Sequence, residues 1–240
     1  MTSRNQFGRT GLNFAACWLP AVALAILPGC AVFAYLVAEF SPAQKVEAVY
    51  ELPENRRVLV FVDDYGNPDD NIAARDIKRR LTQKLNHELD QHEIVGSTVP
   101  YAKLVDVQSA TPNFRSLRTE EVGQKVDADL VVYVHVDRFA LRDPDSGRLW
   151  HGRLECRLKV LDVKQGMAGR GGRLWPQDAD LYDVKAVDIP AESETSATYG
   201  EVLTRELIDQ MAVRIGKVFR EHKVESRDVT WEKVKEEDTR

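Results

Sequence analysis

One uninterrupted apolar run and the periodic segment after it limit most strongly what this chain can fold into. Residues 58–62 read Val-Leu-Val-Phe-Val with no polar side chain between them, which is typical of a strand covered on both faces. From about residue 71 to 89, aliphatic side chains recur every fourth position with basic residues between them. This spacing predicts a helix whose single apolar stripe packs on a sheet.

The next segments continue the alternation of strands and helices. Residues 93–99 and 130–136 predict strands, and residues 101–107 and 116–126 predict two short helices between them. The beginning of the domain therefore has the strand–helix–strand–helix–strand order of right-handed crossover units.

The second half of the chain has a different pattern. Residues 138–150 and 149–163 predict an antiparallel hairpin, a weaker strand follows at 181–189, and residues 199–222 predict a long helix. We expect an α/β fold, on the border of α+β, in which one domain contains a mixed sheet of about five strands.

The first forty residues have the layout of a secretory signal. Positive charge comes from Arg4, Arg9 and the amino terminus, residues 15–27 are almost wholly apolar, and no acidic residue precedes Glu39. This layout predicts a signal peptide over residues 1–29 and export of the mature protein.

The end of this signal resembles the lipobox of bacterial lipoproteins. Leu27-Pro28-Gly29-Cys30 places a small residue directly before a cysteine and a leucine upstream. The resemblance implies cleavage before Cys30, a diacylglycerol on its thiol and a fatty acyl chain such as palmitate on the new amino terminus. Ala31 stands where resembling proteins of the inner membrane have aspartate, so the outer membrane is the expected one.

An uncleaved membrane anchor is the alternative for the same segment. The uncharged run continues from Gly11 through Cys30 to Ala38, and roughly 20 apolar residues are enough to span a bilayer. In both interpretations the basic start stays in the cytoplasm and the residues after Glu39 face the periplasm.

Charge and cysteine content exclude some classes of function. Removal of residues 1–29 leaves 31 basic against 38 acidic residues, a net charge of −7, which argues against nucleic acid as a partner. Cys156 would then be the lone cysteine after Cys30, in a segment that alternates apolar and charged residues. We expect Cys156 to be a core residue on a strand, without a redox or nucleophilic role.

Two segments resemble a family of periplasmic modules. Residues 122–132, Val-Gly-Gln-Lys-Val-Asp-Ala-Asp-Leu-Val-Val, are similar to the helix, Gly-Ala-Asp and apolar strand of the TolB amino-terminal domain, CsgG and LpoB. Leu161-Asp162-Val163-Lys164-Gln165-Gly166 is similar to the turn after a later strand in the same modules. The resemblance covers roughly residues 57–222 and implies a protein that binds partners without catalysis, so no catalytic residues are carried over.

An acidic loop is the main candidate for chemistry. Asp63, Asp64, Asp69 and Asp70 follow the predicted central strand, where open sheets commonly bind ligands. Carboxylates there could bind a divalent cation, but the spacing is not that of a calcium loop, and Asp69 and Asp70 suit the start of a helix. We therefore expect neither a metal nor a cofactor.

Other candidate groups have weaker patterns. The five histidines lack the spacing of a zinc site, although His135 and His151 could become neighbours if their strands pair. Glycines in residues 166–172 are best explained as a hairpin connection, because no Lys-Ser or Lys-Thr follows them as in a phosphate-binding loop. Three aromatic residues are expected near the hairpin, either as packing or as a contact surface: Trp150, Trp175 and Tyr182.

The sequence as a whole favours a lipid-anchored envelope protein that acts as a non-catalytic binding or assembly component with a protein partner. Its parts would be a signal peptide (1–29), a tether (30–56), a periplasmic α/β domain (57–222) and a charged tail (223–240). One alternative is an envelope hydrolase that uses Asp63 and Asp64. The other is a purely structural protein with a single membrane-spanning segment.

Overall fold

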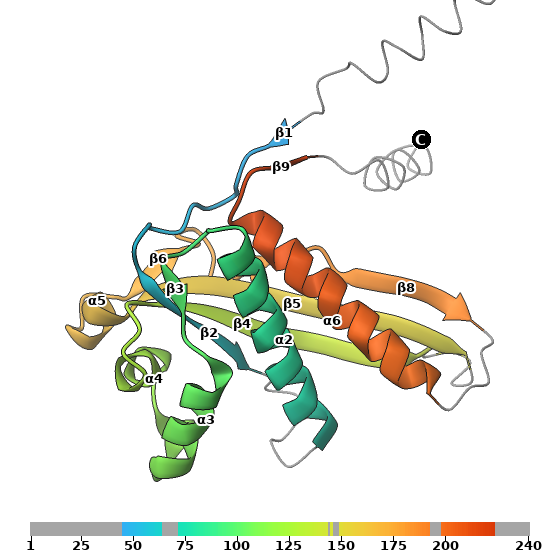
Figure 1. The fold of residues 1–240 in the computed structure, drawn as a ribbon, viewed down its shortest axis with the longest axis horizontal. Coiled ribbons are helices and arrows are strands. Elements are labelled where there is room, and N and C mark those ends of the chain that lie inside the picture. Colours follow the sequence, from blue (N-terminus) through green and yellow to red (C-terminus); the bar gives the residue numbers. More distant parts are fainter. Residues whose placement is uncertain (1–44, 64–71, 144, 146–148, 193–197, 224–240) are drawn as a thin grey trace, which may run out of the picture. The chain divides into compact units, whose positions relative to one another are not determined.

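The computed structural model describes residues 45–63, 72–143, 145, 149–192 and 198–223 (Figure 1). Residues 46–222 form one compact unit. Lys45 and Lys223 belong to a second unit, the remainder of which lies outside the described residues. The predicted signal peptide, Cys30 and nearly all of the charged tail also lie outside the described residues.

The compact unit is built on a seven-stranded mixed sheet of order β3-β2-β4-β5-β6, in which β7 and β8 also pair with β5. The pairs β2–β3 and β2–β4 are parallel, and every pair that includes β5 is antiparallel. The strands are β2 (Arg57–Asp63), β3 (Ser97–Thr98), β4 (Leu130–Arg142), β5 (Trp150–Asp162), β6 (Arg173–Trp175), β7 (Tyr182–Asp183) and β8 (Val187–Glu192). A separate two-stranded sheet is formed by β1 (Lys45–Val46) and β9 (His222–Lys223).

Five α-helices and one 3-10 helix connect these strands within the described residues. They are α2 (Ile72–Gln91), α3 (Tyr101–Ala110), η1 (Phe114–Ser116), α4 (Thr119–Lys125), α5 (Val163–Met167) and α6 (Tyr199–Val218). Among these helices, none is long and apolar enough to cross a membrane.

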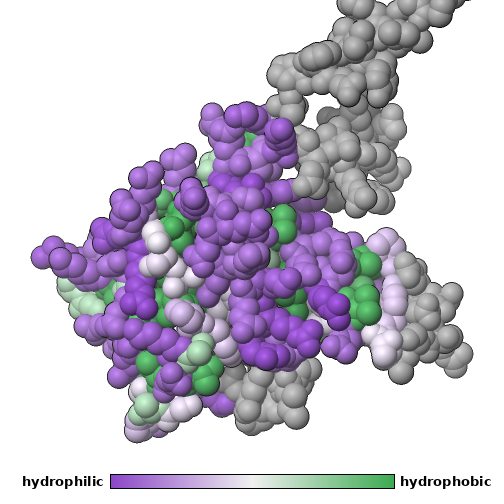
Figure 2. Space-filling model, viewed as in Figure 1, coloured by the Kyte–Doolittle hydropathy of each residue, from purple (hydrophilic) through white to green (hydrophobic). Residues whose placement is uncertain are grey.

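One face of the sheet is covered by the two long helices, α2 and α6, which lie side by side across the strands (Figure 1). Their apolar stripes meet alternate side chains of β2, β4 and β5 in the larger of two hydrophobic clusters, and Leu81, Leu85 and Leu207 are fully buried there. The outward surface of the helix pair is mainly hydrophilic (Figure 2). Both helices are therefore amphipathic in the way that their four-residue spacing predicts.

The opposite face is divided. The short helices α3, α4 and α5 cover the part of this face near the start of β2 and β4 and the end of β5. There Leu59, Val131 and Leu161 form a second, smaller cluster with Val122 and Val126. Gly123 makes this close packing possible, because a Cβ added there would lie 2.6 Å from Val163 Cγ2. Towards the end of β4 and the start of β5, where the two strands form the hairpin, the same face carries charged side chains in place of apolar ones.

The α/β prediction is confirmed, including the two parallel crossovers, the hairpin and the long carboxy-terminal helix. The sheet has seven strands where about five were expected. Strand β6 has three residues and is too short for a period-two pattern, and the single strand expected over 181–189 is divided into β7 and β8. The strand expected over 93–99 is limited to Ser97–Thr98, and α5 begins directly after β5, before the expected glycine-rich connection.

The segment before β2 packs on the rest of the compact unit. The backbone N–H groups of Val49 and Tyr50 donate to the Val218 carbonyl at 2.9 and 3.1 Å. The Tyr50 ring stacks on Trp175 at 5.5 Å, and Leu52 is buried in the larger cluster. Residues 46–56, which the sequence analysis assigned to the tether, are thus part of this unit.

Candidate functional site

The candidate site includes Asp63, the last residue of the central strand β2. The parallel pairing of β2 with β4 places it level with His135 and brings Tyr133 close to it. The Tyr133 hydroxyl donates to Asp63 Oδ2 at 3.0 Å. On the other side, Lys78 Nζ of α2 lies 4.0 Å from Asp63 Oδ1. The Asp63 carboxylate is therefore held between a phenol and an ammonium group.

A cavity of about 270 Å³ opens beside Asp63. Its lining residues come from β2, β4, α2 and the segment from α3 through η1 to α4. The described residues that line it are Phe61, Val62, Asp63, Lys78, Thr82, Tyr101, Leu104, Gln108, Phe114, Arg115, Leu117, Thr119, Val122 and Tyr133.

Aromatic rings dominate the apolar part of the lining. Tyr133 is buried, and its ring centroid lies 6.1 Å from that of Phe61 on the neighbouring strand. Tyr101 and Phe114 are partly buried and approach from the other wall. On β5, Lys159 Nζ lies 4.9 Å from the centroid of the Tyr133 ring, a separation at which a cation and a ring attract.

The acidic loop that the sequence analysis singled out is only partly described. Asp63 lines the cavity, whereas Asp64, Asp69 and Asp70 lie outside the described residues. Within the described ranges, no group of three or more His, Cys, Asp or Glu side chains could hold a metal ion.

The histidines His135 and His151 are not brought together, although their strands pair. In the register of β4 with β5, His135 is opposite Arg157, and Trp150 pairs with Arg142 near the hairpin end. The His135 ring instead stacks on Tyr133 at 6.5 Å, next to the cavity.

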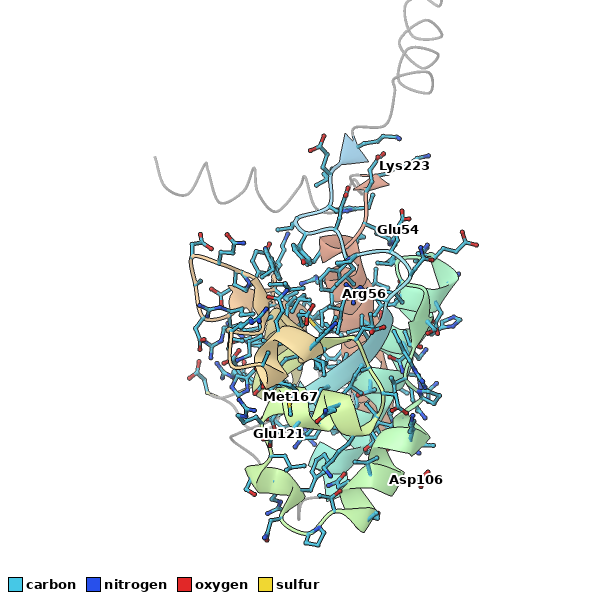
Figure 3. The ribbon with its side chains drawn as sticks, turned by 90° about the vertical axis from the view of Figure 1, so that its left-hand side faces the viewer. Glu54, Arg56, Asp106, Glu121, Met167 and Lys223 are labelled. Atoms are coloured by element: carbon cyan, nitrogen blue, oxygen red, sulfur yellow. The ribbon has the colours of Figure 1, made fainter. Side chains whose placement is uncertain are left out.

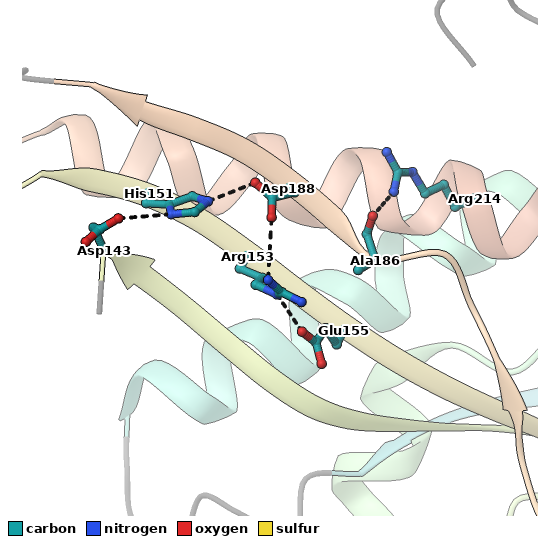
Figure 4. Close-up of polar contacts among 7 residues, drawn as sticks. All are labelled: Asp143, His151, Arg153, Glu155, Ala186, Asp188 and Arg214. Atoms are coloured by element: carbon teal, nitrogen blue, oxygen red, sulfur yellow. Dashed lines mark hydrogen bonds and ion pairs between the residues drawn. The ribbon is translucent and has the colours of Figure 1, made fainter. Parts of the chain in front are cut away.

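His151 belongs to a network on the charged half of the sheet face (Figure 4). Its Nε2 lies 2.8 Å from Asp188 Oδ1, and its Nδ1 lies 3.6 Å from Asp143 Oδ2. The hydrogen bond to Asp188, together with both negative charges, raises the pKa of His151 above its usual value. Arg153 extends the network by pairing with both Asp188 and Glu155.

A second ion pair lies further along the same face. Arg157 Nε is 2.9 Å from Asp137 Oδ2, and the guanidinium also contacts Asp137 Oδ1. Neighbouring charges of opposite sign therefore satisfy one another along this face, which is the pattern of a solvated sheet surface.

The remaining candidates have structural surroundings. Cys156 is buried on β5, and burial followed by the charges of Asp137 and Glu155 raises the pKa of its thiol far above the usual range. Its thiolate, which is the nucleophilic form, is thus strongly disfavoured. Directly before the segment expected to be a glycine-rich connection, the Asp162 side chain caps α5 by accepting from the backbone N–H of Gln165 at 2.7 Å.

The aromatic residues of the hairpin region form two separate packing groups. Trp175 contacts Tyr182 and Tyr50, with ring centroids 4.6 and 5.5 Å apart. Trp150 instead packs against Tyr199 and lies under the Arg142 guanidinium, 3.4 Å from the ring centroid. Both groups connect strands to neighbouring segments, so packing is their structural role.

Sequence reasoning missed the residues that complete the cavity. Tyr133 is on the predicted strand, but its approach to Asp63 depends on β2 pairing with β4. Gln108 and Arg115 come from α3 and η1. Asp106, on the same helix as Gln108, lies on its outer side and does not line the cavity (Figure 3). Assigning β4 as the neighbour of β2 would have identified Tyr133.

No family model matches the chain, and no curated protein matches it significantly. Among solved structures, lipoprotein GNA1162 from Neisseria meningitidis is 13% identical, with 66% of this chain and 99% of that one covered and a TM-score of 0.38. The PelC dodecamer from Paraburkholderia phytofirmans is 14% identical, with 75% and 98% covered and a TM-score of 0.34. A putative lipoprotein from Caulobacter crescentus is 12% identical, with 65% and 84% covered and a TM-score of 0.32. These TM-scores are below 0.5, so the likenesses carry no argument about the role of this chain.

Proposed function

We propose that this chain is a lipid-anchored protein of the bacterial cell envelope, attached through Cys30 with its domain facing the periplasm. The sequence Leu27-Pro28-Gly29-Cys30 after a basic and apolar start supports the anchor. Two or three acyl chains hold a protein stably on a membrane, since each buried methylene contributes roughly 0.8 kcal/mol. The outer membrane is the proposed location, because Ala31 follows the cysteine.

The proposed role is non-catalytic binding, in the manner of the TolB amino-terminal, CsgG and LpoB modules that residues 122–132 resemble. The observation that carries this role is the cavity beside Asp63, whose carboxylate accepts from Tyr133 and lies 4.0 Å from Lys78 Nζ. A carboxylate held in this way is suited to orient a bound group. A further part of the proposal is that the hairpin face or the sheet edge contacts another envelope protein.

The anchor is tested by intact mass and membrane fractionation of the full chain from a bacterial envelope. We expect the wild type to begin at Cys30 with added acyl mass, and Cys30→Ala to lose both the cleavage and the added mass. Cys17→Ala is the matched control, because it removes the other cysteine of the amino-terminal segment and leaves the lipobox intact. A wild-type protein that keeps residues 1–29 and stays embedded would instead support the single membrane-spanning segment.

An envelope hydrolase is the second candidate, because the Asp63 carboxylate lies on a cavity. In that case Asp63, together with Asp64, would act on envelope polymers or lipids. The test is incubation of the purified full chain with isolated envelope, followed by mass spectrometry of the released fragments.

Two variants separate the candidates. Asp63→Asn removes the carboxylate charge in the cavity, and Asp106→Asn makes the same change on the outer side of α3. Release of fragments by the wild type and Asp106→Asn but not by Asp63→Asn would establish the hydrolase and refute the non-catalytic role. Equal results for all three proteins would exclude Asp63 as a catalytic residue.

A further inference from the structure

The size of the cavity limits what it can enclose. Its volume of about 270 Å³ is slightly below the roughly 300–1,000 Å³ of pockets that enclose a drug-sized ligand. The cavity therefore suits a single ring or a group of similar size.

The charged groups of the lining limit the charge of the ligand. Among the described residues of the lining, Asp63 supplies one carboxylate, while Lys78 and Arg115 supply two cations. An anion would be close to Asp63, and a cation would be close to Lys78 and Arg115. A wholly apolar ligand would lie against three charged groups and offer none of them a hydrogen bond, which is unfavourable. A neutral ligand with several polar groups avoids each of these costs.

The uncharged side chains of the lining limit the shape of the ligand. The described lining includes four aromatic side chains, of which Phe61, Tyr101 and Phe114 are partly exposed and Tyr133 is buried. In the same lining, Gln108 provides both a carbonyl and an amide group, and Thr82 and Thr119 provide hydroxyls that donate or accept. A ligand that matches this lining has a flat C–H face to lie against a ring and hydroxyl groups around its edge.

From this combination we infer that the cavity binds one neutral, polyhydroxylated ring, such as the hexose unit of a glycan or a free sugar. The C–H face of the ring packs against the aromatic side chains. The hydroxyl groups of the ring accept from Lys78 and Arg115 and donate to Asp63, because a hydroxyl can do both. This inference rests on the proposed binding role of the cavity, but it is independent of the lipid anchor.

The test is saturation-transfer NMR on the full-length protein in a detergent without a sugar headgroup. Methyl β-glucoside is the principal probe, and cellobiose distinguishes a ring that is linked in a chain from a single sugar. Acetate, methylammonium and cyclohexanol are the anionic, cationic and apolar comparison probes. We expect saturation of the C–H protons of methyl β-glucoside and weaker transfer to the three comparison probes.

The matched variants are Gln108→Ala and Gln83→Ala. Both side chains are exposed, so both variants should fold, but only Gln108 lines the cavity. Loss of a neutral hydrogen bond should weaken binding about two- to tenfold in Gln108→Ala, and Gln83→Ala should bind as the wild type does. Arg115→Ala is the second cavity variant and should also weaken binding.

Several results would overturn the inference. Stronger binding of acetate or methylammonium than of the sugar would show that the cavity binds an ion, which leaves its role as a binding site intact. Sugar binding that is equal in the wild type, Gln108→Ala and Arg115→Ala would place the sugar elsewhere. No saturation transfer to any probe would refute both the inference and a small-ligand role for the cavity, whereas the mass of the Cys30 terminus would still decide the anchor.

Discussion

The two faces of the main sheet differ in how completely they are covered, and the candidate site lies where that coverage ends. On the face under α2 and α6, alternate side chains of β2, β4 and β5 are apolar over most of their length. On the other face, apolar side chains beneath α3–α5 change to charged ones along the same strands. Phe61, Asp63 and Tyr133 lie at this change, next to the cavity. The first face is thus wholly structural, whereas aromatic, polar and charged side chains meet at the boundary on the other face.

The largest expected effect tests the fully covered face. Leu85 has no exposed surface and packs between α2 and the sheet. Leu85→Ala should lower the free energy of unfolding by about 2–5 kcal/mol, because it removes buried methyl groups and leaves a cavity. Urea unfolding followed by circular dichroism measures this loss, and Gln83→Ala on the exposed side of α2 should change it by less than about 0.5 kcal/mol. If Leu85→Ala lowers the free energy of unfolding as little as Gln83→Ala does, Leu85 does not belong to the hydrophobic core.

The apolar half of the second face is tested at Gly123. A Cβ there would lie 2.6 Å from Val163 Cγ2 and 2.8 Å from Val131 Cγ2. Gly123→Ala should therefore cost about 1–3 kcal/mol through overpacking, partly offset by the roughly 1 kcal/mol that alanine gains over glycine in a helix. The same unfolding experiment applies. Gly169→Ala is a useful contrast, because its strain comes from a positive φ of 69° with open space around the added carbon. A stabilised Gly123→Ala protein would mean that α4 lies further from the sheet.

The charged half of that face should contribute much less. Asp137 and Arg157 form an ion pair in which the Arg157 side chain is 40% exposed. A double-mutant cycle with Asp137→Asn and Arg157→Gln should give a coupling energy of about 0.2–1 kcal/mol, since water screens exposed pairs. The coupling should also decrease in high salt. A coupling as large as the Leu85→Ala effect would remove the energetic distinction between the two faces.

The smallest expected effect depends on pH and concerns His151. Its hydrogen bond to Asp188 and the nearby Asp143 raise its pKa in the folded protein. The stabilisation is therefore complete below the unfolded pKa of about 6.5 and is lost as the pH rises through the raised folded value. Wild type should exceed His151→Gln in stability by more at about pH 5.5 than at about pH 8.5, with a change below about 1 kcal/mol.

His87→Gln is the control for this pH dependence, because His87 is exposed on α2. The stability difference between wild type and His87→Gln should change little over the same pH range. If the two variants show the same pH dependence, the Asp188–His151–Asp143 contacts do not stabilise the folded protein.

Local periodicity alone predicted much of the fold. The unbroken apolar run of β2 identified a covered central strand, and the four-residue spacing of α2 and α6 located both long helices to within a few residues at most. The alternation around Cys156 correctly placed the thiol in the core. The short strand β6 was not predictable in this way, because three residues cannot establish a period, and the pattern over 181–189 did not show that this segment divides into β7 and β8.

The sequence by itself determined which segments are strands or helices and which side of each is apolar, because those properties repeat over neighbouring residues. Apart from the hairpin of β4 and β5, only the tertiary structure decided which strands are neighbours and which polar groups therefore come into contact. Asp63 and Tyr133 are 70 positions apart, and their contact depends on β2 pairing with β4. His135 and His151 are much closer in sequence, yet the register of β4 with β5 separates them. The pattern of neighbouring residues does not predict which of these side chains come into contact. Their contacts depend on strand register and helix packing, which form only when the whole sheet assembles.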